Sequence, residues 1–183
     1  MNSLKGQLLI ASTRLLDPNF VQGVILMIQH NKDGAMGLML NRQTEVAVRD
    51  AWAQVSESPC AREDNLYIGG PCEGVLMALH TFANASQVEV FPGLHFATET
   101  QHMEWLLQQA ETPMRFCVGY AGWSPGQLET EMEGGSWIVT AGTVERIFMP
   151  DDAQWPHIKR ELAMTAVLPN YNPKIISPDP SRN

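Results

Sequence analysis

The segment that most constrains the fold of this chain is an almost uniformly apolar run, Gly23-Val-Ile-Leu-Met-Ile-Gln-His30. A run of this length and composition is typical of a β-strand that is buried on both faces. It ends at His30-Asn-Lys-Asp-Gly34, where the Asp-Gly step favours a hairpin, and Ala35-Met-Gly-Leu-Met-Leu-Asn41 is predicted to return as the paired strand. The sequence therefore predicts a buried β-hairpin between residues 23 and 41.

The other strands and helices are predicted from short apolar runs, turn residues and helix caps. Strands are expected at residues 7–11, 65–71, 75–80, 88–91, 94–97, 114–120, 137–140 and 144–148, and helices at 45–55, 98–109, 124–134 and 150–164, the last interrupted at Pro156. Strand pairs joined by hairpins, with helices between groups of strands, are typical of a mixed sheet with helices packed on it. The predicted fold class is therefore α/β, or α+β.

The length of the chain bounds its domain organisation. With 183 residues, of which 44% are hydrophobic and 17% charged, the chain is long enough for one buried core and short for two. We therefore expect a single domain over residues 1–165. Residues 166–183 contain four prolines and are expected to form an extended tail.

The balance of charges limits the classes of partner that the chain is expected to bind. A formal net charge of −8, with only 12 scattered Lys and Arg residues, opposes direct nucleic-acid binding, which needs basic side chains against phosphates. No apolar run approaches the roughly 20 residues of a membrane span, and the first residues do not resemble a signal peptide. Three cysteines without a CxxC spacing (Cys60, Cys72 and Cys117) suit reduced thiols, so a cytoplasmic protein is expected.

The segment Gly119-Tyr-Ala-Gly-Trp-Ser-Pro-Gly-Gln-Leu-Glu-Thr-Glu131 holds the densest group of conformationally special residues. A strand ending at Tyr120 is predicted to meet a glycine-rich turn around Trp123. Ser124 would then cap a helix, with Pro125 at its first position and Gln127 completing a capping box. Tyr120 is expected to fill the core at the strand end, whereas Trp123 suits a core position and an exposed recognition position equally.

The catalytic motifs in this segment are incomplete. Gly122-Trp-Ser-Pro-Gly126 satisfies the G-x-S-x-G pattern of a hydrolase, but Pro125 has no N–H to supply to an oxyanion hole. Glu129 and Glu131 could coordinate a cation or meet a basic partner. However, residues at i and i+2 of a helix do not face each other, so two solvated charges are favoured. None of the five histidines has a metal-binding spacing.

Four ordered motifs resemble the AlgH/YqgE family of bacterial proteins: Leu16-Asp-Pro-Asn-Phe20, His30-Asn-Lys-Asp-Gly-Ala-Met-Gly-Leu-Met-Leu-Asn-Arg42, Ile68-Gly-Gly-Pro71 and the segment 119–131. The resemblance covers about residues 5 to 160. It implies a mixed, strongly bent sheet that forms an open, barrel-like core with helices outside, in a cytosolic protein. The family has no assigned reaction, and one branch carries the label of transcriptional regulator. The chain departs from the family pattern at its C-terminal end.

These observations lead to the hypothesis of a non-catalytic binding or regulatory protein with an unknown protein or small-molecule partner. No catalytic residue, metal or cofactor is predicted. The expected binding site combines the segment 119–131, the hairpin 30–41 and the turn 69–71, with the residues His30, Asn41, Gly69, Gly70, Pro71, Tyr120, Trp123, Gln127, Glu129 and Glu131. The alternatives are a small hydrolase or metal-dependent enzyme that uses His30, Glu129 or Glu131, and a direct DNA binder.

Overall fold

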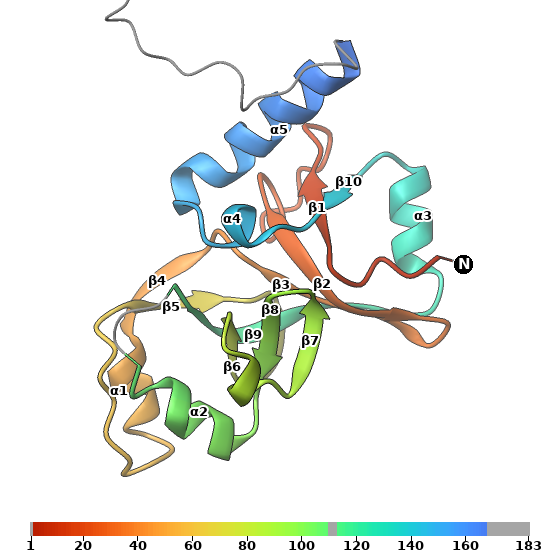
Figure 1. The fold of residues 1–183 in the computed structure, drawn as a ribbon. Coiled ribbons are helices and arrows are strands. Elements are labelled where there is room, and N and C mark those ends of the chain that lie inside the picture. The colour runs from red at the N-terminus through yellow and green to blue at the C-terminus, as the bar shows by residue number, and fades with distance from the viewer. Residues whose placement is uncertain (1, 110–112, 168–183) are drawn as a thin grey trace, which may run out of the picture.

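A computed structural model describes residues 2–109 and 113–167 of the chain (Figure 1). Their strands are β1 (Gln7–Ala11), β2 (Val24–Asn31), β3 (Gly34–Met39), β4 (Gln43–Ala47), β5 (Asn65–Ile68), β6 (Cys72–His80), β7 (Val88–Phe91), β8 (Leu94–Ala97), β9 (Arg115–Trp123) and β10 (Trp137–Ala141). The helices are α1 (Val48–Trp52), η1 (Ala83–Ala85), α2 (Thr100–Leu106), α3 (Gln127–Glu133), α4 (Val144–Ile147) and α5 (Asp151–Val167).

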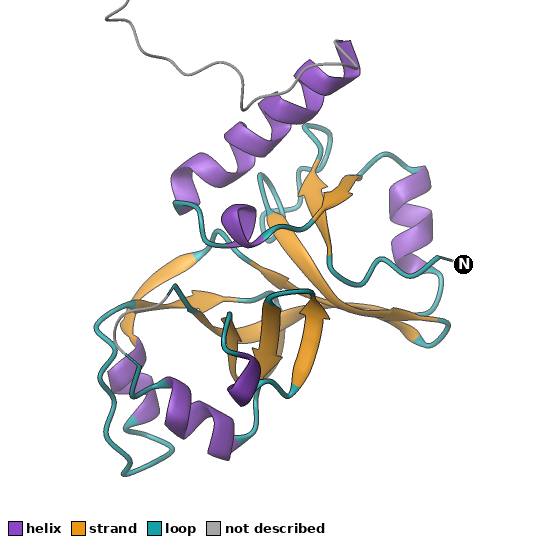
Figure 2. Cartoon of the chain, in the orientation of Figure 1, coloured by secondary structure: helices purple, strands orange, loops and turns teal. Residues whose placement is uncertain are grey.

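The strands form one curled sheet with the order β10-β1-β2-β3-β9-β6-β8-β7. All neighbours along this path are antiparallel, while β5 pairs with β9 in parallel and with β4 in antiparallel orientation. The curled sheet makes a half-barrel, and the helices lie around its outside, α1 and α2 at one end and α3, α4 and α5 at the other (Figure 2). The expected mixed and strongly bent sheet with outer helices is therefore confirmed.

The hairpin predicted from the apolar run is present as β2 and β3, with Leu26 opposite Leu38 and His30 opposite Ala35. Along β2 the side chains alternate between two cores. Val24, Leu26 and Ile28 enter a cluster inside the half-barrel, which we call the barrel core, and Ile25 and Met27 enter a cluster beside α3, which we call the α3 core. Burial of each such side chain contributes about 1.5–3 kcal/mol. Both faces of β2 are thus covered, as the composition indicated.

A third cluster, which we call the α1–α2 core, lies beneath helices α1 and α2 and contains Trp52, Met103 and Phe116. Strand β9 contributes to all three cores. Phe116 enters the α1–α2 core, Cys117 the barrel core, and Ala121 and Trp123 the α3 core. The position of β9 in the middle of the sheet explains how one strand reaches all three clusters.

Two element predictions were wrong. The first three residues of the predicted helix 45–55 belong to strand β4, because Gln43 pairs with Tyr67 and Ala47 with Asn65, and the helix begins only at Val48. The predicted strand 144–148 is helix α4, since the Thr143 hydroxyl accepts a hydrogen bond from the Arg146 N–H and caps a helical turn.

Other boundaries of the elements differ from the predicted ones. Strand β9 continues to Trp123 rather than ending at Tyr120, and Pro156 stands inside α5 without interrupting it. Of the predicted tail, Ala166 and Val167 belong to α5, and residues 168–183 lie outside the described residues. None of the helices in the described ranges combines the length and the apolar character that a membrane crossing requires.

Candidate functional site

The segment 119–131 is a strand, a tight turn and a helix. Because β9 runs on to Trp123, which pairs with Ala35, the glycines at 119 and 122 lie within the strand. The Gln127 N–H donates to the Ser124 carbonyl, and Gly126 has φ 77° and ψ −9°, as at the third position of a type II turn with proline before it. Gly126 is the N-cap of α3, so the predicted cap at Ser124 was wrong.

The Glu131 carboxylate binds both indole groups of the α3 core. Its Oε2 accepts hydrogen bonds from Trp123 Nε1 at 3.0 Å and Trp137 Nε1 at 2.8 Å, and its Oε1 accepts one from Gln127 Nε2 at 3.0 Å. Trp123 is only 6% exposed. Glu131 is therefore not the solvated charge that the i, i+2 spacing favoured, and Trp123 is a core residue rather than an exposed anchor.

Glu129 is the partner of His30. The His30 Nδ1 atom accepts from the Leu4 N–H at 3.0 Å, so the ring carries its proton on Nε2, which lies 2.8 Å from Glu129 Oε1. A hydrogen bond from its own backbone N–H, and then the one to His30, lower the pKa of Glu129. Both nitrogens of His30 are engaged, which leaves neither free to act as a base.

The three histidines on β6, β8 and α2 come near one another without forming a metal site. The rings of His80 and His95 stack with centroids 5.8 Å apart, and the buried His80 Nε2 atom has no hydrogen-bond partner among the described residues. Burial, followed by the charges of His95 and His102, lowers the pKa of His80 to about 4. No three His, Cys, Asp or Glu side chains in the described parts of the chain are grouped closely enough to hold a metal ion.

The turn after β5 carries the next predicted site residues, and its glycines are needed for close packing. A Cβ on Gly69 would lie 2.1 Å from the Gly119 carbonyl oxygen, and one on Gly70 would lie 2.2 Å from the Tyr120 carbonyl carbon. Tyr120 itself is half-buried against the barrel core. These contacts show that the turn crosses directly over β9.

Asn41 secures a second turn. Its Oδ1 accepts from the Val24 N–H at 3.0 Å, and its Nδ2 donates to the Gln22 carbonyl at 2.8 Å. Gln22 has a φ of 55°, the left-handed conformation that non-glycine residues seldom adopt. Asn41 is therefore a structural residue that holds the chain just before β2.

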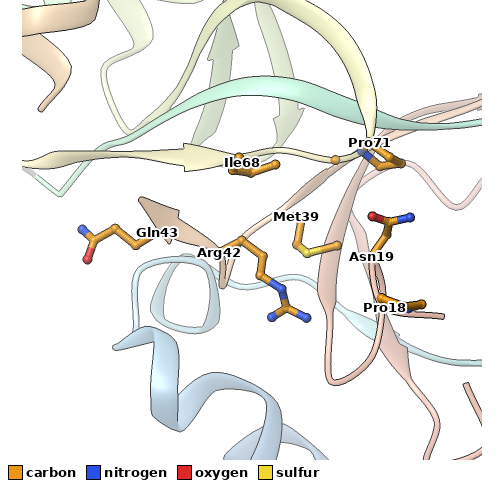
Figure 3. A pocket seen from close by; sticks show the side chains of 8 residues that line it. Pro18, Asn19, Met39, Arg42, Gln43, Ile68 and Pro71 are labelled. Atoms are coloured by element: carbon orange, nitrogen blue, oxygen red, sulfur yellow. The ribbon is translucent and has the colours of Figure 1, made fainter. Parts of the chain in front are cut away.

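The predicted site consequently divides into two places. Gln127, Glu129 and Glu131 lie on α3, where Glu129 binds His30 and Glu131 binds Trp123 and Gln127. Gly70 and Pro71 instead border a separate cleft of about 300 Å³, with the lining Pro18, Asn19, Met39, Arg42, Gln43, Ile68, Gly70 and Pro71 (Figure 3). None of the residues beside α3 lines this cleft.

Arg42, which the sequence analysis did not select, lies on the wall of this cleft. Its half-buried guanidinium donates from Nη1 to the Asn41 carbonyl at 3.1 Å and from Nη2 to the Val21 carbonyl. Burial lowers the pKa of Arg42. Its place at the end of the motif 30–42 was the available signal, but the sequence did not reveal that Pro18 and Ile68 lie beside it.

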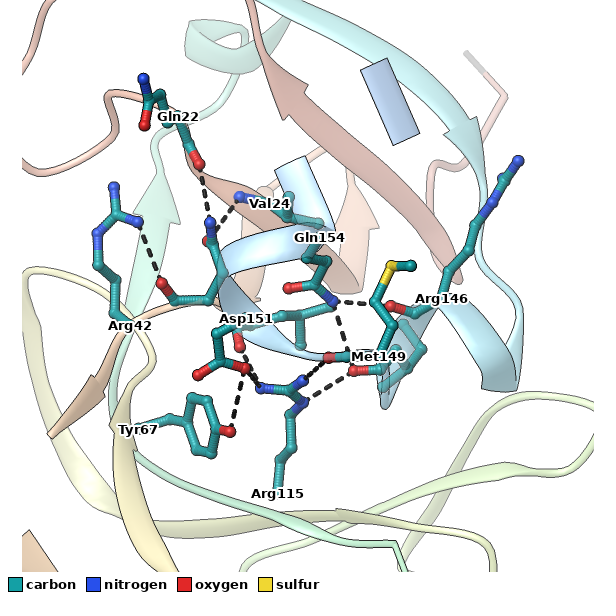
Figure 4. A network of polar contacts seen from close by, with 12 residues as sticks. Gln22, Val24, Arg42, Tyr67, Arg115, Arg146, Met149, Asp151 and Gln154 are labelled. Atoms are coloured by element: carbon teal, nitrogen blue, oxygen red, sulfur yellow. Dashed lines mark hydrogen bonds and ion pairs between the residues drawn. The ribbon is translucent and has the colours of Figure 1, made fainter. Parts of the chain in front are cut away.

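A buried polar network next to Arg42 was also missed. The Arg115 side chain, 4% exposed, donates to Asp151 Oδ1 at 2.6 Å and to the carbonyls of Leu40, Ile147 and Met149 (Figure 4). It also stacks over the Tyr67 ring at 4.4 Å. Burial raises the pKa of Tyr67 to about 12. This network joins β9 to α4 and α5. In the sequence, it is indicated only by a charged residue, Arg115, at the start of an apolar strand.

The lining of the cleft combines apolar and polar groups. Its eight lining residues contribute two side-chain amides, one guanidinium and several apolar surfaces, and they include no nucleophile or general base. A cleft that is mostly apolar with a few polar groups is typical of a small-molecule site, although this one is at the small end of the roughly 300–1,000 Å³ range.

Comparisons with known proteins agree with this fold. A family model described as AlgH-like matches residues 8–166. A UPF0301 protein of Chlorobaculum tepidum is 38% identical over 149 residues, covering 78% of each chain, and one of Myxococcus xanthus is 36% identical over 151 residues, covering 80% of this chain and 83% of the relative. The solution structure of the AlgH protein from Pseudomonas aeruginosa has a TM-score of 0.71 at 27% identity, covering 95% of this chain and 93% of that one. These matches confirm the resemblance predicted from the four motifs.

Proposed function

The chain belongs to the AlgH-like family, and on this premise we propose that it is a non-catalytic binding protein whose ligand is a small molecule held in the cleft. The observation that carries the proposal is the convergence of three distant segments. The motifs at 16–20, 30–42 and 68–71 contribute Pro18 and Asn19, Met39 and Arg42, and Ile68, Gly70 and Pro71 to one cleft. The fold brings together segments that lie up to about 50 residues apart in the chain.

The alternative of an enzyme built on His30, Glu129 and Glu131 has less support. Each of these side chains is already occupied by another group of the protein, and the carboxylate of Glu131 is bound by two indoles. The residues of segment 119–131 support the fold beside α3. We therefore move the proposed binding site from that segment to the cleft, and keep Gly70 and Pro71 as its predicted members.

We base the proposed class of partner on the net charge of the chain, and the proposed cellular location on its free cysteines. The net charge of −8 disfavours direct binding to a DNA duplex, so any regulatory role is proposed to act through ligand binding. Duplex binding that persists at physiological ionic strength would contradict this. The three free cysteines suit a reducing compartment, and we place the protein in the cytoplasm.

The test is native mass spectrometry of the purified protein after incubation with a small-molecule extract of the cells that produce it. A bound molecule is expected on the wild type and not on Ile68→Trp, because the larger side chain would fill the cleft. Val46→Trp is the matched control, since Val46 is 50% exposed and Ile68 49%, but Val46 is not part of the cleft lining.

Three outcomes separate the possibilities. A molecule that is retained by wild type and Val46→Trp, lost by Ile68→Trp and recovered unchanged would support the proposal. A molecule that Ile68→Trp retains would place the site elsewhere. Recovery of a chemically altered molecule would show turnover and overturn the non-catalytic assignment.

A further inference from the structure

Arg42 differs from the other shielded arginines of the described structure. Arg62, Arg115 and Arg146 are buried or half-buried, and each forms an ion pair, with Asp64, Asp151 and Glu161 respectively. Arg42 is also half-buried, yet both of its hydrogen bonds go to backbone carbonyls, and within the described ranges it makes no ion pair. No direct ion pair therefore neutralises the charge of this guanidinium within the described ranges.

The guanidinium has capacity left for a ligand. It carries five N–H donors in a planar fork that fits the two oxygens of a carboxylate or phosphate, and the carbonyls of Asn41 and Val21 account for two of them. The hydrogen bonds to these carbonyls also fix the guanidinium in place. An anion would therefore meet donors that are already positioned.

The surroundings decide on which side of Arg42 an anion would bind. Asp151 and Asp152 line a smaller cavity of about 180 Å³ that Arg42 also borders, and their negative charges oppose an anion there. In the cleft the other polar side chains are the neutral amides of Asn19 and Gln43, and the exposed side chains of Ile68 and Pro71 offer apolar surface. Met39, which Figure 3 shows between Arg42 and Asn19, is itself buried.

We infer that the ligand of the cleft is a small organic acid, whose carboxylate or phosphate pairs with Arg42 while its apolar part packs on Ile68 and Pro71. This inference rests on the proposed function, which assigns the cleft as a binding site but not the charge of its ligand.

The test compares four probes of similar shape: benzoate, phenyl phosphate, neutral benzamide and cationic benzylamine. Each is titrated into ¹⁵N-labelled protein, and binding is followed by the amide resonances of Asn19, Ile68 and Gly70. The anions are expected to bind more tightly than benzamide, and benzylamine is expected not to bind. The comparison of benzoate with phenyl phosphate shows which acidic group the cleft prefers.

Variants then test Arg42 itself. Arg42→Gln is expected to weaken binding of the anions about ten- to a hundredfold, as for loss of charged hydrogen bonds, and to weaken benzamide binding much less. Arg49→Gln removes an equal charge from an exposed position and should change nothing. Because Arg42 also holds the turn at Val21, Arg42→Lys serves as a second variant that keeps the charge and should bind the anions with intermediate affinity.

The outcomes distinguish the two proposals. Equal binding of benzoate and benzamide, or anion binding that Arg42→Gln leaves intact, would overturn the organic-acid inference while the cleft remains a binding site. If none of the four probes shifts the resonances of the cleft, both proposals are overturned. Since the comparison among probes on the wild type needs no variant, it holds even if Arg42→Gln fails to fold.

Discussion

Arg115 connects more separate parts of the chain than its neighbours on β9. Its guanidinium binds the Asp151 carboxylate and three carbonyl oxygens, which belong to Leu40, Ile147 and Met149. Replacing Arg115 with methionine would keep much of the side-chain volume but leave the carboxylate and the carbonyls unpaired. Breaking such a pair costs about 3–5 kcal/mol. We expect Arg115→Met to lose stability of that order in urea unfolding.

Arg49 supplies the control for Arg115. It also pairs with a carboxylate, that of Asp50, but both side chains are mostly exposed. The variant Arg49→Met is expected to stay within about 0.5 kcal/mol of the wild type. A similar loss of stability in Arg115→Met and Arg49→Met would mean that the buried network contributes no more to stability than an ordinary surface ion pair.

His80 makes the stability of the protein depend on pH. Its pKa is lowered from 6.5 to about 4 in the folded chain, so between these values the unfolded chain takes up a proton that the folded chain does not. The contribution of His80 is therefore complete above pH 6.5 and is lost as the pH falls toward 4. The loss is up to about 3 kcal/mol, or about 1.4 kcal/mol per pH unit within the window.

The variant His80→Asn checks this assignment. Asparagine can keep an acceptor for the Phe82 N–H, which His80 Nδ1 binds at 3.3 Å, but it does not titrate. Urea unfolding at a series of pH values should show a shallower acid slope for His80→Asn, after its lower stability at neutral pH is subtracted. An unchanged slope would assign the pH dependence to another group.

At the scale of elements, the crossing of β9 by the turn after β5 depends on the absence of a side chain at Gly69. The Cβ of an alanine there would lie 2.1 Å from the Gly119 carbonyl oxygen and 3.0 Å from a methyl group of Leu38. The backbone would have to move apart. We expect Gly69→Ala to lower the free energy of unfolding by about 3 kcal/mol or more, at the upper end of overpacking costs.

The matched control for Gly69 is Gly93→Ala. Gly93 has a φ of +87° and no heavy atom within 4 Å of the position of a Cβ, so this variant tests conformational strain alone. Gly93→Ala is expected to lower the free energy of unfolding by about 1–2 kcal/mol. If thermal and urea unfolding show that Gly69→Ala loses no more stability than Gly93→Ala, close packing does not explain why position 69 holds a glycine.

The elements that the sequence predicts well are those whose burial can be recognised from the pattern of their own residues. Residues 24–28 are all apolar because both faces of the strand are covered there, and the turn signal around Asp33-Gly34 correctly marks the hairpin, whose two turn residues are Lys32 and Asp33. The start of the predicted helix 45–55 was wrong for the opposite reason. Residues 43–47 pair with the strand that contains Asn65 and Tyr67, about twenty residues further along the chain, and only residues 48–52 form the helix.

The site was harder to predict than the fold, because its contacts are long-range. Glu129 meets His30 across 99 positions and Arg115 meets Leu40 across 75, and no local spacing indicates either pair. Glycines at 69 and 119 were correctly selected as special. The sequence could not show that their use is the close approach of two strands rather than contact with a ligand.

At the scale of the whole molecule, the three cores are joined through shared strands. Neighbouring residues of β9 point in opposite directions, Phe116 into the α1–α2 core and Cys117 into the barrel core. Strand β2 is shared in the same way between the barrel core and the α3 core. Unfolding of one core would therefore expose the strand that forms a wall of the next, which favours a single cooperative transition.

Two indole N–H groups can report on this cooperativity from opposite ends of the molecule. Trp52 in the α1–α2 core donates to the Ser58 carbonyl, and Trp137 in the α3 core donates to Glu131. In a urea titration followed by NMR, the native indole resonances of both should disappear at the same midpoint. The variant Phe116→Leu, which changes only the α1–α2 core directly, should lower both midpoints equally. Separate midpoints, or a shift confined to Trp52, would mean that the described chain contains two units of folding and that the shared strands do not couple them.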